Sequence, residues 1–353
     1  MAPRVVASEA PREAHGRRAL IAFAALAALV AVALAIAVGE PVSFTLAFSD
    51  ASSLDHAIVF RARIPRVVLG LLVGAGLATT GAAYQGLLRN PLAEPYVLGV
   101  SGGAALGATL AIAAASVLTL PVVATTTFVA LAAAVSGGLA TLFVWIVASR
   151  ATNLVGRDDV MRGHATSILL AGVVVNAIAA GAITFVKTVV RASTAQQLLF
   201  WLAGFLDVPT PTALAVVALA VGLGAAILLP VAPRLNLLAM GDEHAAHLGV
   251  EVRALERRVF LASSIVVGAV VATSGMIGFV GLLVPHLVRR LFGPDHRLIL
   301  PLSLVFGGAT LVACDLLARA TFRFLGTEPP VGAITALIGG PLFLFLLARR
   351  RVG

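Results

Sequence analysis

Charged residues are scarce in this chain of 353 residues. They make up only 12% of the sequence, whereas 60% of the residues are hydrophobic. A soluble domain usually carries about 25% charged residues and about 45–50% apolar ones. Because one water-soluble core cannot bury so many apolar side chains, the composition excludes ordinary cytosolic, disordered and disulfide-rich secreted proteins. It is typical of a polytopic membrane protein.

Cysteine and aromatic residues are also rare. The single cysteine, Cys314, excludes an internal disulfide, so the fold rests on packing. Aromatic residues account for only 6% of the chain, whereas glycine numbers 34. Small residues let transmembrane helices approach one another closely. We therefore expect an all-α membrane protein whose helices form a tightly packed bundle.

The apolar residues fall into ten runs. A hydrocarbon core of about 30 Å needs about 20 mostly apolar residues in a helix. Runs of this kind lie near residues 19–38, 64–88, 97–115, 121–148, 165–186, 212–231, 258–277, 279–292, 298–318 and 331–348. The sequence thus predicts about ten transmembrane helices in a single domain over residues 19–350, preceded by a cytoplasmic tail over residues 1–18.

Basic residues orient this bundle. The net charge is +9, and with ten helices most basic residues lie on the same side as the two termini. Cytoplasmic loops of membrane proteins carry an excess of Lys and Arg. The pattern therefore predicts that both termini are cytoplasmic, and it accounts for the net charge without binding of nucleic acid.

Two parts of the sequence repeat each other. A shift of 194 residues places Gly74, Ala75, Ala78, Thr79, Gly81, Pro91 and Gly99 on Gly268, Ala269, Ala272, Thr273, Gly275, Pro285 and Gly293. Because an odd number of helices separates the copies, the second copy has the opposite orientation. We expect two inverted halves, about 61–190 and 255–350, an arrangement common in transporters. Pro91 and Pro285 each predict a helix break.

The groups that this chain would need for ion coupling, ATP hydrolysis or catalysis are missing. Only Asp315 lies well within a predicted span, whereas ion-coupled carriers normally keep ionisable groups at the midplane. The single lysine, Lys187, does not belong to a glycine-rich phosphate loop, so any ATPase is another chain. No catalytic set of side chains converges. His244 and His247 have a spacing that suits a metal, but no further ligands are evident, and we assign no metal site.

Some basic residues lie on the side opposite the termini. They are Arg61, Arg63, Arg66, Lys187, Arg191, Arg319 and Arg323. One interpretation is that these side chains reach from helix ends toward the membrane surface. The other is a basic rim that receives an acidic partner.

The longest cytoplasmic segment between spans covers residues 233–253. Within it, residues 240–250 are expected to form a short helix, because Asp242 and Glu243 suit its first turn and Gly249 suits its end. Ala246 and Leu248 give this helix an apolar side. It is either a docking site for a soluble partner or a plain linker.

Several motifs together resemble the permease subunit of the cobalamin, haem and iron-siderophore ABC importers. They are RIPR at 63–66, GAAYQ at 81–85, RNPLAEP at 89–95, LGVSGGA at 98–104, GFVGLLVPHLVR at 278–289 and PVGAITALIGGP at 330–341. The resemblance covers about residues 20–350. It implies an importer of a metal chelate in the bacterial inner membrane, working as a homodimer with two ATPase subunits and a periplasmic binding protein.

The resemblance also implies roles for particular residues. Arg63, Arg66 and Arg319 would receive acidic residues of the binding protein. Asn90 and Leu92 would narrow the cytoplasmic end of the pathway, with Thr166 and Ser167 near a second constriction. The residues expected to couple to the ATPase are Gly241, Asp242, Glu243, Ala246, Leu248 and Gly249. The chain itself would hold no cofactor, since ATP and Mg²⁺ bind to the ATPase. The alternative is an ion-coupled secondary transporter.

Overall fold

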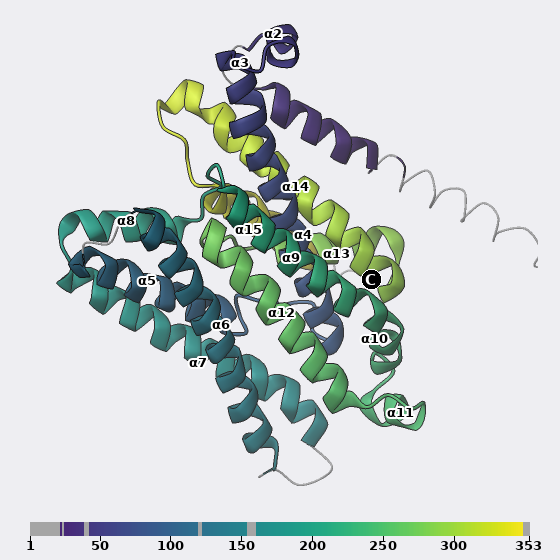
Figure 1. Ribbon diagram of the computed structural model, residues 1–353. Coiled ribbons are helices and arrows are strands. Elements are labelled where there is room, and N and C mark those ends of the chain that lie inside the picture. Colours follow the sequence, from purple (N-terminus) through teal and green to yellow (C-terminus); the bar gives the residue numbers. More distant parts are fainter. Residues whose placement is uncertain (1–21, 23–24, 39–41, 119–121, 154–159, 349–353) are drawn as a thin grey trace, which may run out of the picture.

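The computed structural model describes residues 22, 25–38, 42–118, 122–153 and 160–348, and every regular element in these ranges is helical (Figure 1). The α-helices are Ala25–Ala37, α2 (Phe44–Ser49), α3 (Leu54–His56), α4 (Ile64–Leu87), α5 (Val100–Leu118), α6 (Val122–Asn153), α7 (Val160–Val189), α8 (Ala192–Ala203), α9 (Pro211–Leu228), α10 (Ala232–Leu238), α11 (Asp242–His247), α12 (Val252–Ser274), α13 (Val280–Phe292), α14 (His296–Leu325) and α15 (Val331–Ala348). A π-helical segment, Ala57–Arg63, leads into α4, and a 3-10 turn, Leu229–Val231, joins α9 to α10. The predicted all-α class is confirmed, whereas the predicted tail over residues 1–18 lies outside the described residues.

Six helical stretches of the described chain are long and apolar enough to cross a membrane. They are Leu54–Leu87, Val100–Leu118, Thr127–Arg150, Thr166–Val189, Pro211–Leu238 and His296–Phe322. Two shorter apolar helices, Ala25–Ala37 and Val331–Leu346, accompany them. Each of the ten apolar runs contains a helix, so a multi-pass helical membrane protein is confirmed. The number of ten spans stays a prediction.

Helix α4 lies inside the bundle and packs against α9, α12, α13 and α14 (Figure 1). Glycines let its backbone touch two of these neighbours. A Cβ atom at Gly81 would overlap the carbonyl oxygen of Gly281 in α13, and one at Gly74 would overlap that of Gly307 in α14. Close approach of this kind increases dispersion contact between helices that have no hydrophobic driving force in lipid. Glycines in α4 therefore allow its backbone to pack directly against the backbones of α13 and α14.

The second helix break lies upstream of the predicted one. The chain leaves the helical conformation over residues 275–279, between α12 and α13, and Pro285 lies inside α13. Proline has no N–H, so the carbonyl of Gly281, four residues earlier, loses its helical donor. The buried side-chain amide of Gln85 donates to this carbonyl oxygen at 3.4 Å. The break predicted at Pro285 is therefore wrong, whereas Pro91 does lie in the irregular segment after α4.

The two ends of the bundle carry different small elements. Helices α2 and α3 lie at one end, next to the start of α4, and α11 lies at the opposite end (Figure 1). The short helix expected within residues 240–250 is thus present as α11. Its preceding helix, α10, is tied to α14, because Asn236 Nδ2 donates to Asp295 Oδ1 at 2.6 Å. This hydrogen bond, with one from the Arg297 N–H, lowers the pKa of the Asp295 carboxyl.

The contact at Gly81 is testable. We expect Gly81→Ala to reduce the free energy of unfolding by about 1–3 kcal/mol, because the added methyl group meets backbone that cannot move aside cheaply. Gly222→Ala in α9 is the matched control, since nothing lies within 4 Å of its Cβ position. Thermal melting of both variants in detergent measures the difference. Equal melting temperatures would contradict the close contact between α4 and α13.

Candidate functional site

Arg66 and Arg319 meet at one buried carboxylate, that of Asp315 in α14. Arg66, in the first turn of α4, donates from Nη2 to Asp315 Oδ1 at 2.8 Å. Arg319 lies one turn after Asp315 on α14 and donates from Nε to Oδ2 at 3.0 Å. The Asp315 side chain is only 3% exposed. Because a buried charge is costly unless it is paired, each of these groups depends on the others.

Arg319 and a further arginine, Arg63, hold the end of the first described helix. Arg319 donates to the carbonyl oxygens of Ala35, at 2.9 Å, and Val38, at 3.3 Å. Arg63 donates to the carbonyl oxygen of Ile36 at 2.9 Å. The last carbonyls of a helix have no partner within the helix and carry partial negative charge. Two guanidinium groups therefore cap Ala25–Ala37 and fasten it to α14 and to the π-helical segment that leads into α4.

Exposure distinguishes the three predicted docking arginines. Arg63 is buried, with 7% of its surface exposed. The side chains of Arg66 and Arg319 remain 17% and 14% exposed. Arg66 also pairs with Glu328, which lies between α14 and α15 and whose side chain is 32% exposed. A docking role for the three stays a prediction, and each of them has partners within the chain.

The segment between α4 and α5 carries Asn90 and Leu92. Arg89 begins it with a left-handed φ of 48°, which turns the chain out of α4. Asn90 Oδ1 then accepts the Leu92 N–H at 2.9 Å, the local bond with which asparagine stabilises turns. This turn leaves Leu92 46% exposed. The structure thus places an apolar side chain at the surface next to a rigid polar turn.

Thr166 and Ser167 lie on α7, within the apolar run predicted over residues 165–186. Thr166 is exposed and Ser167 is half-buried. Further along α7, a Cβ atom at Gly172 would overlap the carbonyl oxygen of Val97 in the segment after α4. Asn176 on α7 also donates to the carbonyl oxygen of Tyr96. The helix that carries the predicted second constriction is therefore packed against the segment that carries the first.

Glu94 is a structural residue that the sequence interpretation missed. It belongs to the same segment, is 8% exposed, and accepts the Phe279 N–H at 2.8 Å through Oε1. Phe279 directly precedes α13 and has a left-handed φ of 68°. A carboxylate suits the N-terminus of a helix, where N–H groups lack partners. The sequence did offer one indication of this role, since Glu94 is an acidic residue between Pro91 and Pro95 in an apolar stretch.

Helix α11 presents most of its surface to solvent. Gly241 precedes it with a φ of 112°, and Gly249 follows with a φ of 81°, conformations that side chains disfavour. Ala245 is buried against the bundle, whereas Glu243, Ala246, His244 and His247 are exposed. Met240 and Leu248 are 64% and 58% exposed. Two large apolar side chains beside polar ones form a small surface that suits contact with another protein.

An ion pair joins α11 to the segment after α4. Arg89 Nη2 lies 2.6 Å from Asp242 Oδ2, and the two side chains are 32% and 10% exposed. Asp242 is the first residue of α11, and Arg89 directly precedes Asn90. The segment after α4 and helix α11, which lie about 150 positions apart in the sequence, are thus in direct contact. Sequence patterns did not indicate this pairing, because many basic and acidic residues share that end of the bundle.

No metal centre emerges from the part of the chain that the structure describes. No group of three or more His, Cys, Asp or Glu side chains among those residues lies close enough to hold an ion. His244 and His247 are both exposed on α11.

Comparison with known proteins points to one family. Residues 20–349 match the model of the FecCD transport family. The chain is 41% identical over 329 residues to the cobalamin import system permease protein BtuC of Halobacterium salinarum, covering 91% of this chain and 80% of that protein. It is 40% identical over 290 residues to the hemin transport system permease protein HmuU of Yersinia pestis, with 82% of each chain covered.

A solved structure agrees with these relatives. A metal-chelate type ABC transporter in an inward-facing conformation superposes with a TM-score of 0.80 at 27% identity. The match covers 94% of this chain and 99% of that chain. Similarity over nearly the whole of both chains means that the helices of the two proteins correspond in order and arrangement.

Proposed function

Because this chain belongs to the FecCD transport family, we propose that it moves a metal chelate (a ferric siderophore, haem or cobalamin) across the bacterial inner membrane. It is a transport permease of an ABC importer rather than an enzyme, and ATP hydrolysis belongs to a separate ATPase subunit. The family match over residues 20–349 carries this conclusion. Scarcity of charge within the spans suits a pathway that binds a large chelate weakly and lets it pass.

The assembly is a homodimer of this chain with two ATPase subunits, which bind ATP and Mg²⁺, and one periplasmic binding protein. Both termini are cytoplasmic, and the permease domain extends over residues 19–350 as ten spans in two inverted halves. Gly99 and Gly293, which the repeat matches, have φ values of 87° and 92°, and this shared backbone requirement supports the repeat. The start of α4, where Arg66 lies, and α11 are at opposite ends of the bundle, which suits partners on the two faces of the membrane (Figure 1).

The surface of α11 is the docking site for the ATPase. Exposed Met240, Ala246 and Leu248 supply apolar contact, and Glu243 supplies a polar edge. Burial of a few such side chains at the centre of an interface typically dominates its affinity. The glycines at 241 and 249 allow sharp turns on either side, so α11 protrudes as one unit.

The Arg89–Asp242 ion pair transmits movement of α11 to the cytoplasmic gate. Asn90 and Leu92 directly follow Arg89, and the turn that they form is short and hydrogen-bonded. A displacement of α11 by the ATPase therefore pulls on the residues that narrow the pathway. The same movement reaches Thr166 and Ser167 through α7, because α7 packs against the segment that carries Asn90 and Leu92.

Glu328 occupies the place that an acidic residue of the binding protein takes at Arg66. Among the described residues, Arg66 has an inner partner, Asp315, and a more exposed one, Glu328. Exchange of the exposed carboxylate for one from the binding protein leaves the buried pair intact. Arg319 offers a second partly exposed guanidinium beside it, whereas the buried Arg63 donates to the carbonyl oxygen of Ile36.

Uptake into proteoliposomes tests the function. With the ATPase chain and the binding protein present, we expect chelate uptake to require ATP and to persist when ionophores collapse ion gradients. Leu248→Asp should reduce ATP-driven uptake about tenfold or more, because it places a charge in an apolar contact. Leu248→Met retains the apolar surface and is the control. Uptake that follows an ion gradient without ATP would instead identify a secondary transporter.

A double-mutant cycle tests the link between α11 and the gate. Arg89→Gln and Asp242→Asn should each lower the amount of chelate moved per ATP hydrolysed, by about fivefold, the worth of an ion pair of about 1 kcal/mol. The double variant should be no worse than either single variant, because both remove the same interaction. Arg290→Gln, at another exposed arginine, is the control. If the double variant instead lost chelate transport per ATP by the product of the two single losses, the link would be refuted.

Removal of the Glu328 carboxylate tests docking. Glu328→Gln should strengthen binding of the binding protein by a few-fold at low salt, because Arg66 loses an internal competitor. High salt should reduce this gain, since partly exposed charges are screened. Asp207→Asn removes another exposed carboxylate and controls for the general change in charge. Surface plasmon resonance measures both affinities, and identical gains would argue against a specific role of Arg66.

A further inference from the structure

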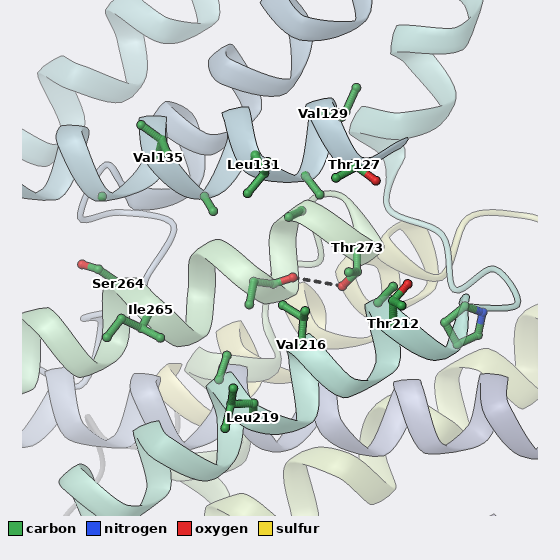
Figure 2. A pocket seen from close by; sticks show the side chains of 18 of the residues that line it. Thr127, Val129, Leu131, Val135, Thr212, Val216, Leu219, Ser264, Ile265 and Thr273 are labelled. Carbon is green, nitrogen blue, oxygen red and sulfur yellow. Dashed lines mark hydrogen bonds between the residues drawn. The ribbon is translucent and has the colours of Figure 1, made fainter. Parts of the chain in front are cut away.

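A large groove lies between α6, α9 and α12, away from every site described above. Its volume is about 1690 Å³, well beyond the roughly 300–1,000 Å³ of common small-molecule pockets. Figure 2 shows Leu131 and Val135 of α6 on one side and Val216 and Leu219 of α9 on the other, with Ile265 of α12 between them. These walls are mainly aliphatic, and no residue with a proposed transport role lines them.

The groove runs along the helices and opens sideways. Arg257, Leu261 and Ile265 line it from successive turns of one face of α12, because residues four apart share a face. Between Arg257 and Thr273 the helix rises by about 24 Å at 1.5 Å per residue, most of the hydrocarbon thickness. Leu219 and Leu261 in its walls are 64% and 61% exposed. In a membrane, such side chains face lipid rather than water.

One end of the groove is positively charged. Arg257 lines this end and is exposed, and it has no hydrogen bond or ion pair with the described residues. Arg253 lies one turn earlier on the same face of α12, Arg258 is adjacent, and Arg150 lies near the end of α6. Glu251, which directly precedes α12, and Glu256 on α12 offset two of these four charges, so an excess of two remains. A basic end on an apolar groove complements a molecule with an anionic head and apolar chains.

An unused hydrogen-bond donor lies in the same region. Trp145 of α6 lines the groove, and its buried Nε1 has no hydrogen-bond partner among the described residues. Buried tryptophan N–H groups usually find a partner. Trp145 precedes Arg150 by little more than one helical turn, so both lie toward the basic end. A phosphate or ester oxygen at this end would accept the indole N–H.

We propose that this groove is a binding site for an anionic phospholipid of the cytoplasmic leaflet. The phosphate pairs with Arg257 and the neighbouring arginines, and an oxygen of the head region accepts the Trp145 N–H. The acyl chains lie along Leu261 and Ile265 between α6 and α9. Basic pockets between transmembrane helices on the cytoplasmic side recognise anionic headgroups in this way. The bound lipid holds α6, α9 and α12 together where their side chains leave this groove between them.

Tryptophan fluorescence offers a direct test, since the chain has only two tryptophans, Trp145 and Trp201. In the Trp201→Phe variant, Trp145 alone reports on contact with brominated acyl chains, which quench it. The full chain is placed in phosphatidylcholine vesicles with a small, equal fraction of brominated phosphatidylglycerol or brominated phosphatidylcholine. We expect the anionic lipid to quench at about fivefold lower mole fraction, the effect of one arginine near the membrane surface.

Arginine variants make the result specific. Arg257→Gln should remove most of the preference for phosphatidylglycerol, whereas Arg290→Gln, at an arginine outside the groove, should keep it. Equal quenching by the two lipids, or an unchanged preference in Arg257→Gln, would overturn the proposal. Absence of quenching by either lipid would show that protein, such as a second copy of the chain, covers the groove. None of these outcomes depends on which chelate is transported.

Discussion

Backbone contact between α4 and its neighbours is the constraint on which the other features depend. Gly74 and Gly81 bring α4 against the main chains of α14 and α13, at positions where a single methyl group does not fit. Helices packed this closely cannot slide past one another. Both ends of α4 therefore keep a fixed position relative to α13 and α14. One end carries Arg66 beside Asp315, and the other leads to Arg89 beside Asp242. A central rigid helix therefore joins the region proposed to receive the binding protein to the region proposed to receive the ATPase.

Several charged side chains around this helix have a partner within the chain. Asp315 is shared by two arginines, Glu94 accepts a helix N-terminal N–H, and Arg89 meets Asp242. Breaking a buried pair is costlier than its net contribution to stability, because the remaining charge stays buried. The pairs thus specify which elements belong together. The more exposed groups, such as Glu328 and the surface of α11, are the ones that we propose for contact with partners.

Much of the architecture was predictable because it follows from local pattern. Lipid requires each spanning segment to satisfy its own backbone hydrogen bonds, so a long apolar run implies a helix without reference to its neighbours. The short helix α11 was likewise predictable from the acidic residues and glycine near its ends. The helix break predicted at Pro285 was wrong, because Gln85 donates to the carbonyl oxygen of Gly281 in place of the missing proline N–H. Gln85 lies far away in the sequence. Glu94 was missed for the same reason, since its partner belongs to another half of the chain.

The sequence alone therefore determined the class of protein, the positions of its apolar helices and, through its motifs, the family. These properties depend on composition and on residues close together in the chain. Only the tertiary structure decided that Arg63 is buried, that Arg66 and Arg319 share one carboxylate, and that α6, α9 and α12 enclose a groove. These depend on distances between segments that lie far apart in sequence. Packing sets such distances, because the way in which helices pack determines which distant side chains come into contact with a given charge or cavity.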